Sequence, residues 1–330
     1  MGARRRTVPP IPVGLRAVAG ELAEERLGLD ELARRGLLTS PVAALAESGF
    51  ECAHVAADGE GATELARRVA AAALAEAGVA AGDVDALFWV SALPRGHVVA
   101  PVGGAPRGGE EAVLANFRYA GGWLQEALGL DRAAVTAVTQ QGCASMFASL
   151  RLARGLLLSE PEVETVLCVG VDVLPPGAHR ELLYNVISDA ACAVVLTRDS
   201  QVDRWLGYRQ LSRGSAWDPV ASRDEILASY FPTARLVIEE VIEAAGLKPE
   251  EVDRVIPTGV TRASWEILMD LTGIPADRLV PPPAFGHTIL ADPFLVLADL
   301  RRNGELRRGE RVLLFTYGFG SSWAALLLEH

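Results

Sequence analysis

One cysteine stands where a thiol could act as a nucleophile. In the stretch AVTQQGCASMFASLRLARGLLL, residues 137–158, Cys143 ends a strand-like run and directly precedes a long apolar helical pattern. A thiol at a helix N-terminus meets the positive end of the helix dipole, ionises more easily and can attack a carbonyl carbon. Cysteine is also among the most buried residue types, so simple core packing is the alternative explanation for this position.

An internal repeat supplies a partner for this thiol. LGLDRAAVTAVTQQGC (128–143) aligns without gaps with TGIPADRLVPPPAFGH (272–287), at a constant separation of 144 residues, and the alignment matches Cys143 with His287. Two equivalent turns that carry a thiol and an imidazole predict a nucleophile and its base, provided that the two halves pack together. The repeat therefore favours a catalytic role for both residues.

The segments around these turns alternate between strand and helix patterns. Apolar strands are predicted at 164–172 and 189–196 in the first half, and at 309–320 and 321–329 in the second. Alternating elements of this kind predict an α/β fold, and continuous apolar strands predict sheets that are covered on both faces. We place the first half at 1–200, with the cysteine, and the second at 201–330, with the histidine.

Composition excludes several classes of function. The 330 residues carry a net charge of −11, which argues against nucleic acid or an anionic membrane as the main partner. No apolar run reaches the roughly 18 residues of a membrane span, and the start, MGARRRTVPPIPVG, has prolines where a signal peptide has an apolar core. The four cysteines lack the spacing of a metal site. We expect a soluble cytoplasmic protein with free thiols and no metal.

With these features the chain resembles the thiolase fold, and specifically the β-ketoacyl-ACP synthase III branch. SDAACAVVL, at 188–196, resembles a glycine-rich strand start of that family, and TSPVAALAESGFECAHVA, at 39–56, resembles its early donor-site segment. The resemblance implies two pseudo-symmetric α/β halves in a five-layered αβαβα arrangement, and a homodimer. We expect the apolar run 163–173 to be an edge covered by the second copy.

The resemblance also implies an oxyanion hole. The turn YGFGSSW, at 317–323, matches the segment that lies beside the thiol in the family. The backbone amides of Cys143 and Phe319 would then stabilise the oxyanion, while Gly318 and Gly320 would let the chain approach closely.

Departures from the family pattern point to its side branch. Thr258, in PTGVTR, stands where the family has its first histidine, His287 stands where it has an asparagine, and Asp292 follows five residues later. This resembles acyltransferases and starter-unit enzymes of antibiotic pathways. Asp292 would orient His287 as in a nucleophile–histidine–acid triad. It could also cap the helix that begins with Pro293.

The sequence is compatible with two acyl donors. The family holds coenzyme A with a tryptophan and an arginine in the early segment, where this chain has Ala43 and Glu47. A glutamate cannot replace an arginine that clamps a phosphate. Either the donor is an acyl carrier protein, or other arginines such as Arg151 or Arg154 contact the coenzyme. No permanently bound cofactor is implied, because acyl-CoA or acyl-ACP serves as co-substrate.

These observations favour an acyltransferase. Cys143 would accept an acyl group and pass it to a hydroxyl or amine in secondary metabolism, in polyketide or antibiotic biosynthesis. A condensing enzyme that forms a carbon–carbon bond is the second hypothesis, although it stabilises an enolate with two side-chain donors and Thr258 removes one of them. A non-catalytic partner subunit of a synthase is the third, and the intact cysteine, histidine and aspartate argue against it.

Overall fold

A computed structural model of the chain describes residues 12–57, 60–99, 108–183, 185–319 and 321–330. Two of our expectations concern residues outside these ranges. The first residues of the chain, 1–11, from which we argued against a signal peptide, and Gly320 lie outside the described residues. None of the described helices is long and apolar enough to cross a membrane.

The first half of the chain forms a mixed sheet with helices on both faces. The strand order is β5-β4-β6-β9-β1, with β4 parallel to β5 and β6, and with β9 antiparallel to both β6 and β1. The elements of this half are β1 (Val13–Leu22), α3 (Ala62–Ala77), β4 (Ala86–Val90), α4 (Gly109–Leu114), α5 (Ala120–Leu128), β5 (Ala134–Val138), α6 (Ser145–Ser159), β6 (Thr165–Asp172) and β9 (Ala190–Arg198).

The second half repeats this plan with one strand fewer. Its order is β11-β12-β13-β10, with β11 parallel to β12. Where the first half has β5, the second has only the isolated bridge between Val255 and Leu279. The elements are β10 (Arg204–Ser212), α7 (Arg223–Ala244), β11 (Arg254–Ile256), α8 (Arg262–Thr272), α9 (Asp292–Arg302), β12 (Arg311–Gly318) and β13 (Ser322–Glu329).

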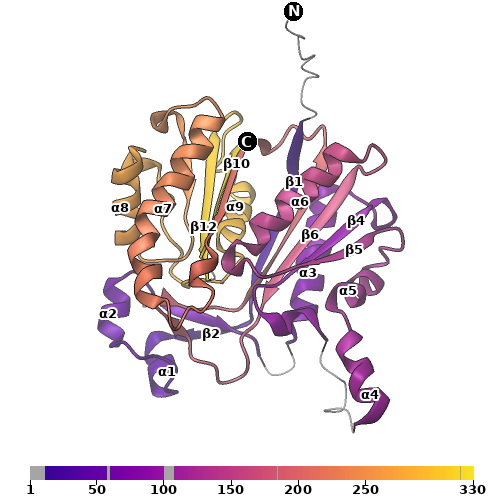
Figure 1. The fold of residues 1–330 in the computed structure, drawn as a ribbon, viewed down its shortest axis with the longest axis horizontal. Coiled ribbons are helices and arrows are strands. Elements are labelled where there is room, and N and C mark those ends of the chain that lie inside the picture. The colour runs from indigo at the N-terminus through magenta and orange to yellow at the C-terminus, as the bar shows by residue number, and fades with distance from the viewer. Residues whose placement is uncertain (1–11, 58–59, 100–107, 184, 320) are drawn as a thin grey trace, which may run out of the picture.

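Small elements pack below the two halves in Figure 1. They include a two-stranded ribbon, β2 with β3, two short helices and a second short ribbon. Their bounds are β2 (Glu25–Gly28), α1 (Leu29–Arg34), α2 (Val42–Glu47), β3 (Cys52–Val55), β7 (Glu181–Leu182) and β8 (Asn185–Val186).

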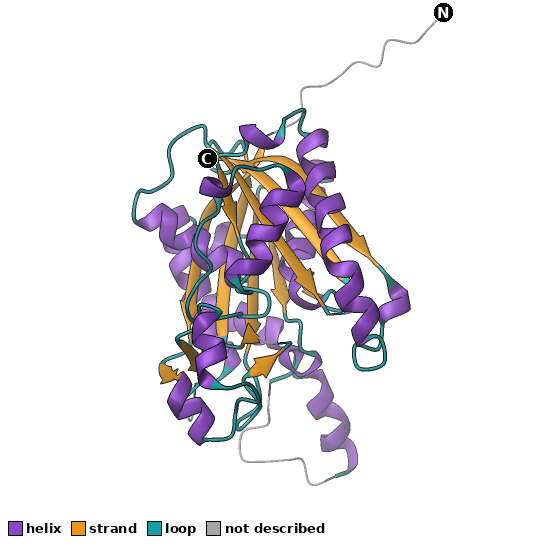
Figure 2. Cartoon of the chain, turned by 90° about the vertical axis from the view of Figure 1, so that its left-hand side faces the viewer, coloured by secondary structure: helices purple, strands orange, loops and turns teal. Residues whose placement is uncertain are grey.

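The halves join along β1 and β10, which pair antiparallel at Gly14 and Arg204. One central core is shared by both sheets and by α6 and α9, which lie between them. A second core lies between α3, α5 and the first sheet, and a third between α7, α8 and the second. Figure 2 shows helices on either side of the strands. This succession of helix, sheet, helix, sheet and helix is the five-layered arrangement that the resemblance implies.

Equivalent helix ends confirm the repeat at single-residue level. Gly129 ends α5 and Gly273 ends α8, both in the left-handed conformation, with φ of +65° and +71°. Glycine is favoured there because it carries no Cβ. The boundary of the two halves at residue 200 stays a prediction; β9 ends at Arg198 and β10 begins at Arg204.

The expected edge at 163–173 is wrong. β6 occupies this run and is hydrogen-bonded on both sides, to β4 and to β9. All of its residues are buried, because helices cover both faces of the sheet. The edge of this half is β5, in which four of the five residues are exposed.

Candidate active site

Cys143 lies in a tight turn at the start of α6. The turn spans Gly142–Ala144, and the side chain of Gln141 just before it accepts hydrogen bonds from Gln210, Ser212 and Ser322, at 2.8, 3.1 and 3.1 Å. These bonds tie the turn to β10 and β13 of the second half. The thiol is therefore held at the positive end of a fifteen-residue helix.

His287 reaches the thiol from the second half. Its Nε2 atom lies 3.2 Å from Cys143 Sγ. The backbone of His287 is held by the first half, because its N–H donates to Val186 O at 2.7 Å and its carbonyl accepts from Ser188 N at 2.9 Å. The two residues that the repeat pairs are thus brought together, and both are buried.

Asp292 fixes the far side of the imidazole. Its Oδ2 is hydrogen-bonded to His287 Nδ1 and also accepts from Gly259 N at 2.8 Å. Its Oδ1 accepts from the backbone N–H and the hydroxyl of Thr288. Asp292 is the first residue of α9, and the hydrogen bonds that its carboxylate makes with described residues all go to residues that precede this helix. The geometry therefore agrees with the orienting alternative, and the N–H on Nδ1 leaves Nε2 to the thiol.

Charge sets the protonation of this buried pair. Burial alone would lower the pKa of His287, but the charges of Asp292 and Cys143 raise this pKa well above its usual value. Burial alone would raise the pKa of Asp292, but the His287 charge and the hydrogen bonds that Asp292 accepts lower it. The shifts favour an ionised Asp292 carboxylate and make His287 a stronger proton acceptor than a free imidazole.

Two backbone amides lie beside the thiol. The turns at Gly142 and Gly318 are in close contact, since a Cβ placed on Gly142 would lie 2.7 Å from Phe319 N. Within the described part of the chain, the N–H groups of Cys143 and Phe319 have no hydrogen-bond acceptor. Two free donors at this place could bind a developing oxyanion.

A small cavity of about 60 Å³ opens at the thiol. Its lining combines the reactive pair with apolar and aromatic side chains: Cys143, Leu182, Leu183, Asn185, Tyr230, Thr258, Val260, His287, Tyr317 and Phe319. Thr258 is thus beside the thiol, where the family has its first histidine. His287 is the one imidazole among the described residues that line this cavity.

A wider cavity of about 610 Å³ shares part of its lining with the first, and we refer to it as the mouth. The two share Leu182, Leu183 and Phe319. Among the described residues that line the mouth, Arg223, at the start of α7, is the cation and Glu181 is a carboxylate. Sequence reasoning missed Arg223 and Tyr230, because no motif marks them and they come near the site only through packing. Tyr317 begins the YGFGSSW turn that was placed beside the thiol, but its side chain was given no role.

The expected donor contacts lie elsewhere. Ala43 and Glu47 share an exposed face of α2. Arg151 and Arg154 lie on α6, where their guanidinium groups cover the rings of Tyr208 and Trp205. None of these four residues lines either cavity at the thiol.

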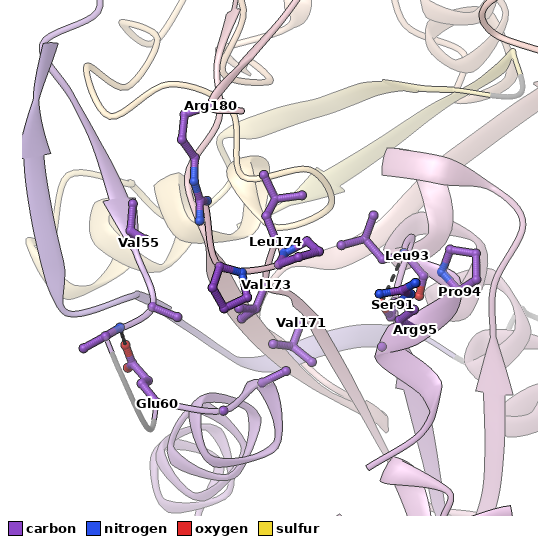
Figure 3. A pocket seen from close by; sticks show the side chains of 17 residues that line it. Val55, Glu60, Ser91, Leu93, Pro94, Arg95, Val171, Val173, Leu174 and Arg180 are labelled. Carbon is purple, nitrogen blue, oxygen red and sulfur yellow. Dashed lines mark hydrogen bonds between the residues drawn. The ribbon is translucent and has the colours of Figure 1, made fainter. Parts of the chain in front are cut away.

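Another cavity, of about 720 Å³, is separate from this chemistry. Figure 3 shows it between Val55, Glu60 and Arg180 on one side and Ser91 and Arg95 on the other. Its lining is mostly apolar and includes neither Cys143 nor His287. Arg180 there is committed to a buried two-pronged ion pair with Asp189, at 2.6 and 3.0 Å. We therefore assign the candidate site to the smaller cavity, where the reactive groups meet.

Comparisons with known proteins point to one family. Residues 242–330 match the family described as 3-oxoacyl-[acyl-carrier-protein (ACP)] synthase III C terminal. Over 308 residues the chain is 26% identical to a β-ketoacyl-[acyl-carrier-protein] synthase III from Nitratidesulfovibrio vulgaris (strain DSM 19637 / Miyazaki F), covering 86% of this chain and 87% of that protein.

Solved structures show the same fold. The 3-oxoacyl-[acyl-carrier-protein] synthase III of Aquifex aeolicus VF5 superposes with a TM-score of 0.79 at 22% identity, over 96% of this chain and 100% of that one. ChlB3, described as an acyltransferase, gives a TM-score of 0.79 at 22% identity, over 96% and 97% of the two chains. The predicted thiolase fold is confirmed.

Proposed function

We propose that this chain, a relative of β-ketoacyl-[acyl-carrier-protein] synthase III with the thiolase fold, is an acyltransferase that works through an acyl-cysteine intermediate. The observation that carries the proposal is the continuous contact from Cys143 Sγ through the His287 imidazole to the Asp292 carboxylate. A thiol, an oriented imidazole and a buried acid form a nucleophile–base–acid triad.

The first half-reaction loads the enzyme. Cys143 Sγ gives its proton to His287 Nε2 and attacks the carbonyl carbon of an acyl-CoA or acyl-ACP thioester. The amides of Cys143 and Phe319 hold the oxyanion while the carbon–sulfur bond of the donor breaks. The leaving thiolate takes the proton from the imidazolium, so acyl-Cys143 and a free donor thiol result.

The second half-reaction transfers the acyl group from Cys143 to the acceptor. His287 Nε2 removes a proton from the hydroxyl or amine of the acceptor, whose oxygen or nitrogen attacks the acyl carbon. Cys143 leaves as a thiolate, which pairs with the imidazolium. The pKa of His287 supports this change of role, because the Cys143 charge that helps to raise it is absent from the acyl-enzyme.

Thr258 argues against condensation. A condensing enzyme must stabilise the enolate that decarboxylation produces, with two side-chain donors on its oxygen. Here the cavity offers one imidazole, and that imidazole is paired with a carboxylate suited to base catalysis. Transfer to a hydroxyl or amine needs only this base.

The proposal extends to the donor path and to the setting of the reaction. The mouth beside Leu182 and Phe319 would admit the pantetheine arm of the donor, with Arg223 near its phosphates. A role in secondary metabolism, in polyketide or antibiotic biosynthesis, is part of the proposal and is supported by the triad pattern. The protein would work in the cytoplasm.

A homodimer is also part of the proposal. β5 leaves an exposed strand edge, and pairing with the same edge of a second copy would cover it. Light scattering should give twice the chain mass of 35.0 kDa. A monomer at micromolar concentration would contradict this part.

A single-turnover experiment separates the alternatives. The protein is loaded with a labelled acyl thioester, and intact mass spectrometry follows the acyl group on the protein and on added hydroxyl or amine acceptors. Cys143→Ala should form no acyl-enzyme, while Cys52→Ala, which changes a buried thiol outside the site, should load normally. His287→Ala should slow transfer more than loading, because the helix dipole still favours the thiolate.

The product decides between transfer and condensation. An ester or amide formed without carbon dioxide supports the acyltransferase. A β-ketone formed from a malonyl thioester with release of carbon dioxide would establish the condensing enzyme instead. Absence of any acyl-Cys143 with acyl-CoA and acyl-ACP alike would refute the triad proposal.

A further inference from the structure

The Thr258 hydroxyl borders the cavity at the thiol. Thr258 is only 2% exposed and lines this cavity together with Cys143 and His287. Its hydroxyl makes no hydrogen bond to a residue that the structure describes, yet it is not one of the polar atoms that the fold encloses, so it is open to the cavity. The hydroxyls of Tyr230 and Tyr317, by contrast, are enclosed and offer nothing to a ligand. Buried polar groups normally have partners, so the Thr258 hydroxyl is available to one that binds in the cavity.

The backbone holds Thr258 in place. Its carbonyl accepts hydrogen bonds from Val260 N at 2.8 Å and from Trp265 Nε1 at 3.2 Å. Trp265 itself is fully buried in the core between α7, α8 and the second sheet. Threonine is also β-branched, which restricts its side chain to few rotamers. The hydroxyl is therefore presented to the cavity from a rigid turn.

The turn that carries Thr258 packs directly on the base. Gly259 N donates to Asp292 Oδ2 at 2.8 Å, and this is the carboxylate oxygen that also binds His287 Nδ1. A Cβ on Gly259 would lie 2.2 Å from Gly286 O and 2.8 Å from His287 Cα. The Thr258 turn therefore lies on the imidazole side of the cavity. The cavity, of about 60 Å³, has room for about two water molecules, so an atom held at His287 Nε2 is within reach of Thr258.

The polar side chains of this cavity leave hydrogen-bond acceptors free. His287 Nδ1 is bound to Asp292, so the neutral imidazole offers Nε2 as an acceptor. The Thr258 oxygen can accept through its lone pairs as well as donate its proton. Asn185 uses its amide nitrogen as a donor to two backbone carbonyls, at 3.3 and 3.1 Å, and keeps its side-chain oxygen as an acceptor. A ligand with two N–H groups satisfies these acceptors better than a ligand with one O–H.

A primary amine matches this arrangement at the moment of attack. Its nitrogen lone pair is directed at the acyl carbon, one N–H donates to His287 Nε2 and the other donates to the Thr258 oxygen. An alcohol has a single O–H, which His287 takes. Its oxygen can then meet Thr258 only by accepting a hydrogen bond, which lowers its nucleophilicity. The acyl oxygen does not compete for Thr258, because the amides of Cys143 and Phe319 hold it in the proposed mechanism.

We propose that Thr258 binds the attacking nitrogen of the acceptor, and that this acceptor is a neutral primary amine. The nitrogen bonds to the acyl carbon and passes one proton to His287 Nε2, while its second proton stays on nitrogen and is held by Thr258. The bond from the acyl carbon to Cys143 Sγ breaks, the thiolate takes the proton back from the imidazolium, and a secondary amide is released. The inference rests on the proposed function and names the acceptor class for the same site.

The test compares acceptors that differ in their N–H and O–H groups. Propylamine has two N–H groups, N-methylpropylamine has one, and propan-1-ol has one O–H. Enzyme loaded with a labelled acetyl group from acetyl-CoA is mixed with each acceptor at pH 9, and single-turnover rates of amide or ester formation are compared per concentration of neutral acceptor. Thr258→Val should slow transfer to propylamine by about tenfold, as for loss of one hydrogen bond, and should leave transfer to the other two acceptors nearly unchanged.

Two matched variants separate binding from structure. Thr258→Ser keeps the hydroxyl and should retain most of the rate with propylamine. Thr63→Val makes the valine change on α3, away from both cavities at the thiol, and should behave as the wild type. Loading of Cys143 from acetyl-CoA should be equal in all of these proteins, because Thr258 acts only after acylation. A merely structural role would instead slow loading and the transfer to all three acceptors together.

Binding of product analogues tests the inference without turnover. Cys143→Ala is titrated with N-propylacetamide, which has one N–H, and with propyl acetate, the ester that lacks it. The amide should bind several-fold tighter than the ester, and the preference should disappear when Thr258→Val is added. If Thr258→Val slows transfer to all three acceptors equally, or to none, the acceptor site is overturned and the acyltransferase stands. If the wild type does not load but the amide preference is present, the proposed function is overturned and the acceptor site stands.

Discussion

His287 Nε2 lies 3.2 Å from Cys143 Sγ, and the two residues occupy equivalent positions in a repeat of 144 residues. Each turn is held by the opposite half: Gln141, beside the thiol, is bonded to β10 and β13, while the backbone of His287 is bonded to Val186 and Ser188. The pseudo-symmetry therefore does more than place two turns together. It makes the separation of nucleophile and base depend on the whole interface between the halves.

Replacement of Asp292 by asparagine should shift the pH dependence of acyl transfer. The carboxylate raises the pKa of His287, so its removal lowers that pKa. Transfer needs the neutral imidazole, and its rate rises with pH through this pKa; the rising limb should therefore move to lower pH in the variant. The plateau should fall by about 10²–10⁴-fold, because the imidazole can adopt the wrong tautomer.

The measurement is the single-turnover rate of transfer from loaded enzyme across pH 5 to 10. Asp299→Asn serves as the control, since this exposed carboxylate lies on the same helix and pairs only with Arg302. If the pH–rate profile of Asp292→Asn has the same rising limb and the same plateau as the wild type, Asp292 does not orient the imidazole. The catalytic group is then a dyad of Cys143 and His287.

Gly318→Ala should disable acylation through the backbone. A Cβ at this position would lie 2.5 Å from Cys143 N and 2.5 Å from Gln141 O, and neither backbone atom can move without displacing the turn. The amide of Cys143 would then leave its place in the oxyanion hole. We expect a loss of acylation rate of about 10²–10³-fold, as for removal of one oxyanion donor.

Gly155→Ala is the matched control for this change. Gly155 lies on α6, and a Cβ there meets no atom within 4 Å. The alanine should preserve acylation and raise the free energy of unfolding by about 0.4–1 kcal/mol. Stopped-flow loading and chemical denaturation of both variants provide the comparison. Normal acylation by Gly318→Ala would mean that the two turns are not coupled.

The sequence predicts the fold and the reactive pair because both depend on the repeat. The proximity of Cys143 and His287 follows from aligned positions, whereas their catalytic roles, and that of Asp292, stay predictions. For Asp292, the local sequence is the same whether the carboxylate caps the helix or orients the imidazole, because an aspartate before a proline fits both roles. Only the position of the imidazole distinguishes them.

Other features depend on packing that no local pattern encodes. β6 is apolar because helices cover both faces of its sheet, and an apolar strand has the same sequence at an edge as in the middle. Tyr230 joins Tyr317 only because α7 packs against β10 and β13. Spacing along the chain carries no information about that contact.

Arg223→Ala should weaken binding of the donor. Among the described residues that line the mouth, Arg223 is the cation, and the donors proposed here carry phosphates on the pantetheine arm. Loss of one exposed charge should raise the KM for the thioester by several-fold at low salt, with little change in kcat, and should flatten the salt dependence of KM. Arg235→Ala, on the same helix but paired with Glu239, should leave KM unchanged. Identical salt dependence in all three proteins would exclude Arg223 from the donor site.

Asp172→Asn should change how stability depends on pH. Asp172 ends β6, is fully buried, and accepts hydrogen bonds from the hydroxyl of Ser91, at 2.7 Å, and from the N–H groups of Ala92 and Leu93. Burial raises its pKa from 3.8 to about 7, although these donors and the charge of His287 oppose the rise. The folded protein therefore holds this proton more tightly than the unfolded chain.

The sign of the effect follows from proton linkage. Between about pH 4 and pH 7 the folded state keeps the proton and the unfolded state has lost it, so the stability of the wild type falls as pH rises through this window. At 1.36 kcal/mol per pKa unit the loss is of the order of 4 kcal/mol at most. Asparagine cannot ionise, so the free energy of unfolding of the variant should change less over the same window. Urea denaturation at pH 4.5 and 7.5 measures the difference, with the exposed Asp277→Asn as control. Parallel stability profiles for Asp172→Asn and the wild type would mean that Asp172 is already ionised in the folded protein at the lower pH.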